Sequence, residues 1–213
     1  MSQLTIAIAK GRLQQETLDL FSRAGVQVEE ELLSSRRLAI EDKSGQFRFI
    51  FVKPADVLVY VEHGIADCGV VGLDVLLEAE TDLLQPATLE IGRCRLVVAG
   101  PTERPLINCG MMRVATKYPR VAANHFGSRG VPVEIIELSG SVELAPVLGL
   151  ADCIVDLVET GKTLEENGLR IIEEIVTSTA RLVVNRVSYQ LKAQRISELL
   201  AALNGATSEG HQA

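Results

Sequence analysis

The chain has no tryptophan, and only 4% of its 213 residues are aromatic. It is also short of positive charge, because 28 acidic residues outnumber 21 lysines and arginines and give a formal net charge of -7. Proteins that bind single-stranded nucleic acid stack bases on aromatic side chains, and nucleic-acid binders in general need a basic face. These shortages exclude nucleic acid as the main partner, so an anionic ligand would have to meet a local group of cations.

Long apolar runs are missing as well. A membrane-spanning helix needs about 20 consecutive apolar residues, and no run in this sequence comes near that length. The first residues, Met1 to Thr5, lack the basic segment and the apolar stretch of a secretory signal. We therefore expect no contact with a membrane and a cytoplasmic location.

The sequence also lacks the spacing patterns of metal sites and of activated nucleophiles. Cys68, Cys94, Cys109 and Cys153 show no C-x-x-C spacing, and the three histidines are scattered. We expect buried free thiols and no metal site built by the protein. No G-x-S-x-G or H-E-x-x-H motif is present either. This favours a reaction that depends on positioning and electrostatics rather than on a nucleophilic side chain.

What the sequence does contain is an alternation of short apolar runs with helix-length segments, which is typical of an α/β fold with largely parallel strands. The predicted strands are Leu4 to Ala9, Phe47 to Val52, Asp67 to Val71, Arg95 to Ala99, Arg113 to Ala115, Val133 to Glu137, Cys153 to Val158 and Arg181 to Val184. Helices are expected from Pro54 to Glu62 and from Pro119 to about Phe126, because proline suits a first helical turn.

The end of the chain predicts one more helix, followed by a frayed tail. Between Ser188 and Leu203, leucine and isoleucine recur at helical spacing, at Leu191, Ile196, Leu199, Leu200 and Leu203. The last residues are rich in Gly, Ser and His.

A break in the pattern predicts two lobes. The stretch Gly100 to Pro105 carries two prolines after a strand and could take the chain into a second lobe, with a return near Thr177 to Arg181. We expect a discontinuous first lobe, residues 1–98 with 182–213, and a second lobe, residues 99–181.

The most informative motif is an apolar strand that leads into a loop of hydroxyl and glycine residues, Glu159 to Thr163. Thr160 and Thr163 offer hydroxyl donors, Gly161 permits close approach of the backbone, and Lys162 adds a cation, so the loop is typical of a phosphate site. Asp156 and Glu159 could accept hydrogen bonds from ribose hydroxyls beside that phosphate. The alternative is that Thr163 forms a capping box with Glu166 and the loop only starts a helix.

Cations follow other predicted strands. Lys10 and Arg12 flank a glycine after the first strand, where an open α/β sheet places its ligands, and could grip a pyrophosphate. Arg37 and Lys53 are weaker candidates of the same kind. Solvated surface cations are the alternative for all four.

For two further groups of residues, the sequence is compatible with either a structural role or a role in ligand binding. Gly69 and Gly72 would allow close approach by a planar ligand or by another segment of backbone. Ser141 or Ser139 could cap a short helix, and Glu143 near its start could either suit the helix dipole or contact a ligand.

Taken in order, these motifs resemble ATP phosphoribosyltransferase, the enzyme of the first step of histidine biosynthesis. The motifs are Ala9-Lys10-Gly11-Arg12, Val61-Glu62-x-Gly64-x-Ala66-Asp67-x-Gly69-x-x-Gly72, Ala115-Thr116-Lys117-Tyr118-Pro119, Gly140-Ser141-Val142-Glu143-Leu144-Ala145-Pro146, and Gly149-Leu150-Ala151-Asp152 continuing through Asp156 to Leu169. The match runs from about Leu4 to Val184. It leaves no room for a C-terminal regulatory domain, so the chain resembles the short, catalytic-subunit form.

The resemblance implies a two-lobed fold of the periplasmic binding protein type II class, with mixed, largely parallel sheets and a cleft between the lobes. ATP and 5-phosphoribosyl 1-pyrophosphate would meet there, with Mg²⁺ carried on the pyrophosphate. It places the 5-phosphate on Glu159 to Thr163 and Asp156 near the ribose. Lys10, Arg12, Arg37 and Lys53 become candidates for ATP and pyrophosphate contacts.

The resemblance also implies a homodimer, and a hetero-octamer with a regulatory subunit that is similar to histidyl-tRNA synthetase. The alternative function is a two-lobed protein that binds or senses a small anion without chemistry. The phosphate loop and the missing export signal count against that alternative.

Overall fold

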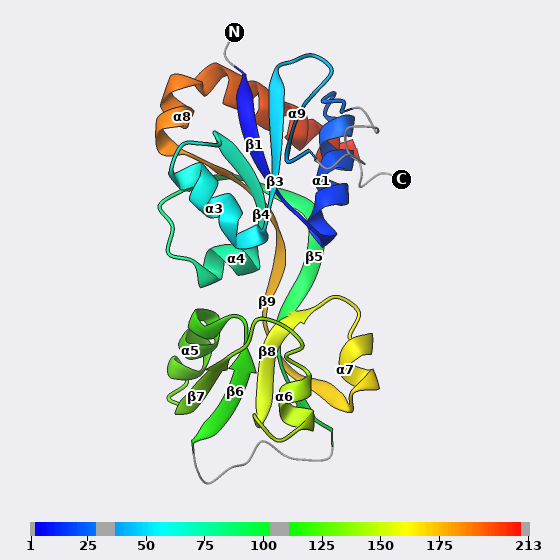
Figure 1. The fold of residues 1–213 in the computed structure, drawn as a ribbon, viewed down its shortest axis with the longest axis vertical. Helices are drawn as coiled ribbons and strands as arrows, with labels where there is room; N and C mark the ends of the chain where they lie inside the picture. Colours follow the sequence, from blue (N-terminus) through cyan, green and yellow to red (C-terminus); the bar gives the residue numbers. More distant parts are fainter. Residues whose placement is uncertain (1–2, 29–36, 103–110, 210–213) are drawn as a thin grey trace. The chain divides into compact units, whose positions relative to one another are not determined.

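The structure is a computed structural model that describes residues 3–28, 37–102 and 111–209. It divides into two compact units. Unit 1 consists of Met1–Gly92 and Thr179–Ala213, and unit 2 consists of Arg93–Ser178. Two long strands, β5 (Leu84–Pro101) and β9 (Leu169–Val184), contribute to both units (Figure 1). In the part of the chain that the structure describes, no helix combines the length and the apolar character needed to cross a membrane.

The remaining elements are short. The other strands are β1 (Leu4–Ala9), β2 (Ala39–Glu41), β3 (Phe47–Val52), β4 (Cys68–Gly72), β6 (Met112–Thr116), β7 (Val133–Glu137) and β8 (Cys153–Val158). The helices are α1 (Arg12–Arg23), α3 (Pro54–Glu62), α4 (Leu73–Glu78), α5 (Pro119–Gly127), α6 (Leu144–Val147), α7 (Lys162–Glu166), α8 (Arg186–Leu191) and α9 (Ala193–Glu209).

In unit 1, β1 lies between two parallel neighbours, β3 and β4. β2 pairs with β3 and β9 pairs with β4, both in the antiparallel sense. Side chains of β1 alternate between two apolar cores, as the two-residue period of a strand requires. Leu4, Ile6 and Ile8 pack with α1 and α9, whereas Ala7 and Ala9 pack with α3. Helices therefore cover both faces of this sheet (Figure 1).

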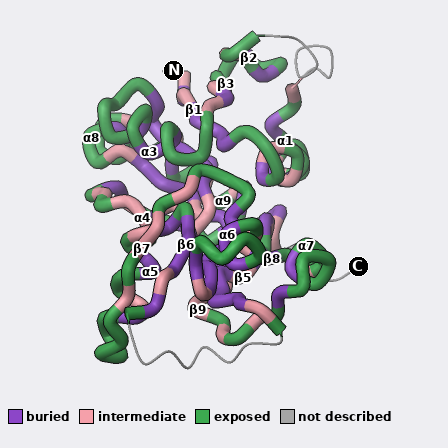
Figure 2. Tube along the Cα trace, turned by 60° about the horizontal axis from the view of Figure 1, so that its bottom comes forward, coloured by how far each residue is buried: buried purple, intermediate pink, exposed green. Residues whose placement is uncertain are grey.

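Unit 2 repeats this arrangement around β6. β6 is parallel to both β7 and β8, and β8 is antiparallel to β5. Val114 and Val155 face the core under α5, whereas Ala115 and Ile154 face the core that includes Leu164 of α7. Figure 2 shows the buried residues following the strands, while turns and outer helix faces are exposed.

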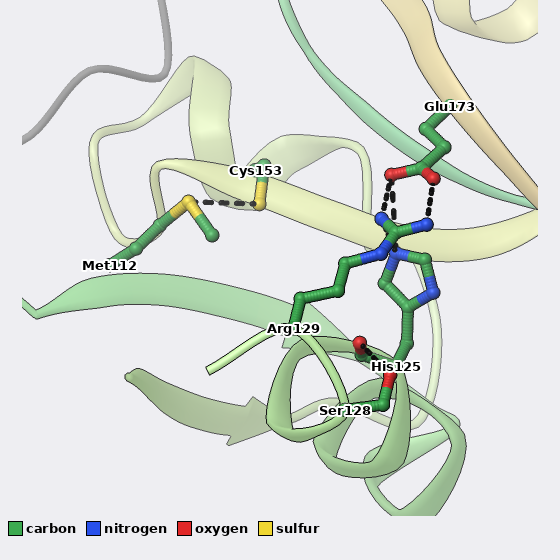
Figure 3. A network of polar contacts seen from close by, with 6 residues as sticks. All are labelled: Met112, His125, Ser128, Arg129, Cys153 and Glu173. Atoms are coloured by element: carbon green, nitrogen blue, oxygen red, sulfur yellow. Dashed lines mark hydrogen bonds and ion pairs between the residues drawn. The ribbon is translucent and has the colours of Figure 1, made fainter. Parts of the chain in front are cut away.

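A polar network ties α5 to β9 within unit 2 (Figure 3). Arg129 donates two hydrogen bonds to the Glu173 carboxylate, and His125 Nε2 lies 3.3 Å from Glu173 Oε2 and 2.9 Å from an Arg129 nitrogen. Hydrogen bonding to Arg129 lowers the pKa of Glu173. The network fixes the helix that starts at Pro119, directly after the strand end where the site described below is built.

The predicted strands and the helices at Pro54 and Pro119 are confirmed. The sequence did not predict β2 or the length of β5 and β9. The single helix expected from Ser188 to Leu203 is wrong, because the chain breaks at Lys192 into α8 and α9. Leu191 is 80% exposed, whereas Ile196, Leu199 and Leu203 are buried as predicted. The expected frayed tail is also wrong as far as Glu209, which ends α9, and residues 210–213 lie outside the described residues.

The crossings between the units fall inside the two long strands, at Gly92/Arg93 and Ser178/Thr179. The sequence placed them at 98/99 and 181/182. The prediction of the first crossing depended on the stretch Gly100 to Pro105. Gly100 and Pro101 continue β5, and residues 103–105 lie outside the described part. Both strands continue through the crossings, and the glycine at the first one, Gly92 with φ +65°, was not used in the prediction.

Candidate functional site

The site lies in unit 2, where the parallel strands β6 and β8 end. Val155 of β8 is in register with Thr116, the last residue of β6, so Asp156 within β8 and Lys117 just beyond β6 lie side by side. A cavity of about 270 Å³ opens here. It is lined by Glu143, Asp156, Leu157, Val158, Glu159, Thr160, Gly161, Thr163 and Leu164. Six residues that the sequence singled out are thus brought together in one cavity: Glu143, Asp156, Glu159, Thr160, Gly161 and Thr163.

Asp156 is the buried carboxylate of this cavity, with 8% of its surface exposed. Its Oδ1 accepts a hydrogen bond from the Leu157 N–H at 2.8 Å and lies 3.4 Å from Lys117 Nζ. Burial raises the pKa of Asp156, Lys117 opposes that rise, and Glu143 adds to it. The carboxylate is therefore held in an environment that penalises its charge, a condition frequent at functional sites.

The loop after β8 contains the sharp turn that the sequence indicated. Gly161 has φ +88°, a left-handed conformation that favours glycine, and it precedes the first residue of α7, Lys162. The Thr160 hydroxyl accepts a long hydrogen bond from the Lys162 N–H at 3.5 Å. The alternative of a Thr163 and Glu166 capping box is wrong, because Gly161 is the N-cap and no side chain caps this helix. Thr160 and Thr163 are exposed, so their hydroxyls are available to a ligand.

Glu143 occupies the N-cap position of α6 and lines the cavity. The expectation that Ser139 or Ser141 caps this helix is wrong, since no side chain donates or accepts a capping bond there. Ser141 is instead the only non-glycine residue with positive φ, 47°, among the described residues. A serine in this conformation is uncommon and marks a tightly specified turn.

The predicted cations belong to unit 1. Lys10 follows β1 and Lys53 follows β3, and because these strands are parallel neighbours the two lysines leave the same edge of that sheet. The Lys10 N–H donates to the Val52 carbonyl at 2.8 Å, which fixes the strand exit. Arg12 is the first residue of α1, and Arg37 lies just before β2. Lys162 is in unit 2 but is not among the residues that line the cavity.

Packing accounts for both glycines of β4. A Cβ on Gly69 would lie 2.5 Å from a Val57 methyl and 3.0 Å from a Val61 methyl, so this position needs glycine to let α3 approach the sheet. A Cβ on Gly72 would overlap the Asp74 carboxylate. Asp74 itself is buried.

Sequence reasoning missed Lys117. The residue lies within the Ala115 to Pro119 motif, from which no role for it was predicted. The signal was present, because Lys117 directly follows a predicted strand, and side chains at the carboxyl ends of neighbouring parallel strands gather at one edge of a sheet.

The other predicted groups can be placed briefly. Cys68, Cys94 and Cys153 are buried free thiols as expected, and Cys109 lies outside the described residues. Within residues 3–28, 37–102 and 111–209, no three His, Cys, Asp or Glu side chains cluster as metal ligands. The cavity combines hydroxyl donors, a glycine turn and carboxylates, which suits a phosphorylated sugar with free hydroxyls.

Comparison with known proteins gives a consistent result. The model of the family described as ATP phosphoribosyltransferase matches residues 53–205. A protein named ATP phosphoribosyltransferase from Caldanaerobacter subterraneus subsp. tengcongensis is 48% identical over 210 residues, which is 99% of this chain and 100% of that protein. One of the same name from Anaeromyxobacter dehalogenans is 51% identical over 208 residues, 97% of this chain and 94% of that protein.

Solved structures agree. A chain of the ATP phosphoribosyl transferase (HisG:HisZ) complex from Thermotoga maritima is 41% identical, with a TM-score of 0.84, over 97% of this chain and 100% of that one. The periplasmic aliphatic sulphonate binding protein SsuA from Escherichia coli is 14% identical, with a TM-score of 0.63, over 98% of this chain and 73% of that one. The second likeness concerns the fold alone, and it confirms the predicted periplasmic binding protein class.

Proposed function

Because the chain belongs to the ATP phosphoribosyltransferase family, we propose that the cavity at the end of β8 binds 5-phosphoribosyl 1-pyrophosphate for transfer to ATP. The reaction is the first step of histidine biosynthesis. N1 of the adenine attacks C1 of the ribose, the bond from C1 to the pyrophosphate oxygen breaks, and pyrophosphate leaves with the bonding electrons. Three relatives that match almost the whole chain, from Caldanaerobacter, Anaeromyxobacter and Sorangium, are named as this transferase, so the alternative of a non-catalytic binding or sensor protein has no support.

The loop Glu159 to Thr163 is the proposed site of the 5-phosphate. Its hydroxyls from Thr160 and Thr163 line the cavity, and the Gly161 turn lets backbone N–H groups approach a phosphate closely. Lys162 adds a positive charge next to this turn. Hydroxyl and backbone donors that act on a charged acceptor form the stronger class of hydrogen bonds, so this loop would supply much of the affinity for the substrate.

Asp156 is the proposed catalytic carboxylate. Both of its contacts within the described residues go to Oδ1, which leaves Oδ2 for a ribose hydroxyl. As pyrophosphate departs, positive charge develops on the ring around C1. A carboxylate fixed in a largely buried cavity stabilises that charge without first reorganising. Glu143, on the same cavity wall, would bind a second polar group of the substrates.

Lys10, Arg12, Arg37 and Lys53 are proposed to bind the phosphates of ATP and the departing pyrophosphate. Lys10 and Lys53 share one sheet edge in unit 1, which concentrates positive charge in a chain that is acidic as a whole. Gly69 and Gly72, which the sequence also suggested for ATP, are proposed to act there only through packing. Ser141 is proposed to bind substrate through its fixed turn.

Mg²⁺ is proposed to arrive with the pyrophosphate. This ion takes oxygen ligands and usually binds proteins through one or two carboxylates together with substrate phosphates. Oxygens of the pyrophosphate itself would supply most of the ligands of this ion. The bound ion would neutralise charge on the leaving group.

Partners follow from the relatives. The Thermotoga maritima chain was solved in a complex named HisG:HisZ, and this chain spans that chain's full length. We propose a homodimer alone, a hetero-octamer with a HisZ-like regulatory subunit, and a cytoplasmic location. Exposed leucines on both units, such as Leu148 at 77% and Leu191 at 80%, offer apolar surface for such contacts. Light scattering of the purified chain, alone and mixed with a HisZ-like protein, tests both assemblies.

The experiment that tests the function is an absorbance assay for phosphoribosyl-ATP. Purified protein is mixed with ATP, phosphoribosyl pyrophosphate and Mg²⁺, and pyrophosphatase removes the pyrophosphate product. Formation of the product supports the transferase, and omission of either substrate is the control. If no product forms even after a HisZ-like subunit is added, the proposal fails.

A further inference from the structure

We propose that Lys117 is a positioning residue for the transfer reaction, which keeps the Asp156 carboxylate ionised and in one orientation inside the cavity. This inference rests on the proposed function of Asp156. It assigns a role to a residue that does not line the cavity and that the sequence motifs alone did not single out.

The strand register brings the two groups together. Lys117 and Asp156 follow a matched pair of parallel-strand residues, Thr116 and Val155, and the lysine Nζ lies 3.4 Å from Asp156 Oδ1. The same Oδ1 accepts the Leu157 N–H. Two donors on one oxygen define the plane of the carboxylate, so its other oxygen is held in a fixed direction.

The backbone around Lys117 is fixed on both sides. The buried Thr116 hydroxyl donates to the Val155 carbonyl at 2.6 Å and accepts the Tyr118 N–H at 2.8 Å. Tyr118 is buried under α5, and its ring centre lies 5.5 Å from Lys117 Nζ. A lysine next to an aromatic face gains a cation–π attraction. Lys117 is therefore restrained although 42% of its side chain is exposed.

The charges around Asp156 explain why this restraint matters. Glu143 faces it from α6, Glu159 lines the same cavity from the loop after β8, and Lys117 faces it from the turn after β6. Lys117 is the cation that the described residues pair with Asp156. A substrate that carries phosphates brings further negative charge. Without the lysine, burial and like charges would all favour the protonated acid, which cannot stabilise a developing cation.

The test uses the full chain with Lys117→Met, the conservative Lys117→Arg, and Arg113→Met as a matched control. Arg113 of β6 pairs at 3.3 Å with Asp152, the residue before β8, and its side chain is 40% exposed. It lies at the opposite end of β6 from the cavity. Circular dichroism and urea unfolding verify that each variant is folded.

We expect the acid limb of the kcat against pH profile to move to higher pH in Lys117→Met, with about tenfold lower kcat at its acid end and recovery at alkaline pH. Lys117→Arg should restore most of the profile, and Arg113→Met should match the wild type. An unchanged kcat profile in Lys117→Met overturns the proposal. So does a rise in KM that is equal at every pH, because it would show a lysine that binds substrate directly.

A second measurement separates this inference from the proposed function. Carbon-13 NMR of aspartate carboxyl groups, with Asp156→Asn used to assign the signal, follows the titration of Asp156 without any substrate. A higher midpoint in Lys117→Met than in the wild type supports the pairing, and equal midpoints refute it. Failure of the wild type to form phosphoribosyl-ATP would instead refute the function and leave this titration result standing.

Discussion

Asp67 and Lys192, which are 125 residues apart, form an ion pair of 2.7 Å between the lysine Nζ and Asp67 Oδ2. The same carboxylate accepts the Thr5 N–H at 2.8 Å and the Ser188 hydroxyl at 2.8 Å, and Lys192 also donates to the Gln3 carbonyl. One buried aspartate before β4 thus joins the start of β1 to the break between α8 and α9. This contact accounts for the position of the break, because Lys192 turns inward where a continuous helix was expected.

We expect Asp67→Ala to lower the free energy of unfolding by about 3 kcal/mol, since it leaves a partly buried ammonium, a hydroxyl and an N–H without their acceptor. Urea unfolding followed by circular dichroism measures the change. The control is Asp82→Ala, which removes an ion pair with Arg186 on the surface, where Asp82 is 86% exposed. Surface pairs contribute little, so the control should leave the midpoint unchanged. Equal effects of the two substitutions would contradict the structural role of Asp67.

The phosphate loop can be tested by removing its hydroxyls. The double substitution Thr160→Val and Thr163→Val keeps side-chain size and deletes two donors of the cavity. We expect binding of phosphoribosyl pyrophosphate to weaken by roughly 1 to 3 kcal/mol for each lost bond to the charged phosphate. Isothermal titration calorimetry measures this loss. Thr81→Val, in unit 1, is the control. Unchanged affinity and kinetics in the double variant would refute the loop assignment.

The sequence predicted most of the local structure, and the reasons are visible in particular residues. Pro54 and Pro119 begin helices as expected, and strands such as Cys153–Val158 follow their apolar runs. The full lengths of β5 and β9 were not predicted, because only their continuous apolar runs were taken as strands; the alternation in β5, where Thr88 and Glu90 are exposed between Ala87, Leu89 and Ile91, is a strand pattern that was not used. The break at Lys192 depends on Asp67, which is distant in the sequence, so local helical periodicity could not reveal it.

In the candidate site, too, some residues could be predicted from local sequence and others could not. Residues that share one stretch of sequence, Asp156 to Thr163, could be grouped by their chemistry alone, and the structure places most of them in one cavity. Lys117 joins them only through the register of two strands. The predictions of the helix caps were wrong for a related reason. The residue that occupies an N-cap is determined by the local backbone conformation, as Gly161 before α7 and Glu143 before α6 show.

A glycine substitution tests whether Gly69 acts by packing. Gly69→Ala places a methyl against Val57 and Val61, and we expect it to destabilise the protein by about 1 to 3 kcal/mol through overpacking. Its kcat and KM for ATP should stay unchanged at a temperature where the variant is folded. Gly205→Ala, at an exposed helical position with open space around it, should instead stabilise by up to about 1 kcal/mol. A raised KM for ATP in Gly69→Ala would show a direct role in binding.

The buried thiols should be unreactive. Burial raises the pKa of Cys68 to about 12 and that of Cys153 to about 12, and Cys153 Sγ also contacts the Met112 sulfur at 3.9 Å (Figure 3). At pH 8 only about one thiol in ten thousand would be ionised, and the thiolate is the reactive form. We expect iodoacetamide to leave both cysteines unmodified in the native protein and to label both in urea, as measured by peptide mass spectrometry. Rapid labelling of either in the native state would contradict its burial.

The substitution Asp156→Asn tests two effects of this carboxylate, one on kcat and one on the stability of the folded protein. Removing the charge should lower kcat by about a hundredfold with little change in KM for phosphoribosyl pyrophosphate, if the carboxylate stabilises the developing cation. A pure rise in KM would mean that Asp156 only positions the ribose.

The same substitution, Asp156→Asn, should raise the stability of the protein although it lowers kcat. Burial raises the pKa of Asp156 above its value of 3.8 in the unfolded chain. The folded state therefore binds this proton more tightly, and the carboxylate lowers stability as the pH rises above 3.8. Asp156→Asn removes this penalty, so we expect a higher urea midpoint than the wild type at about pH 7.5 and a gap that narrows as the pH falls toward about 4. A variant less stable than the wild type near neutral pH would show instead that the pairing of Asp156 with Lys117 outweighs the burial of its charge.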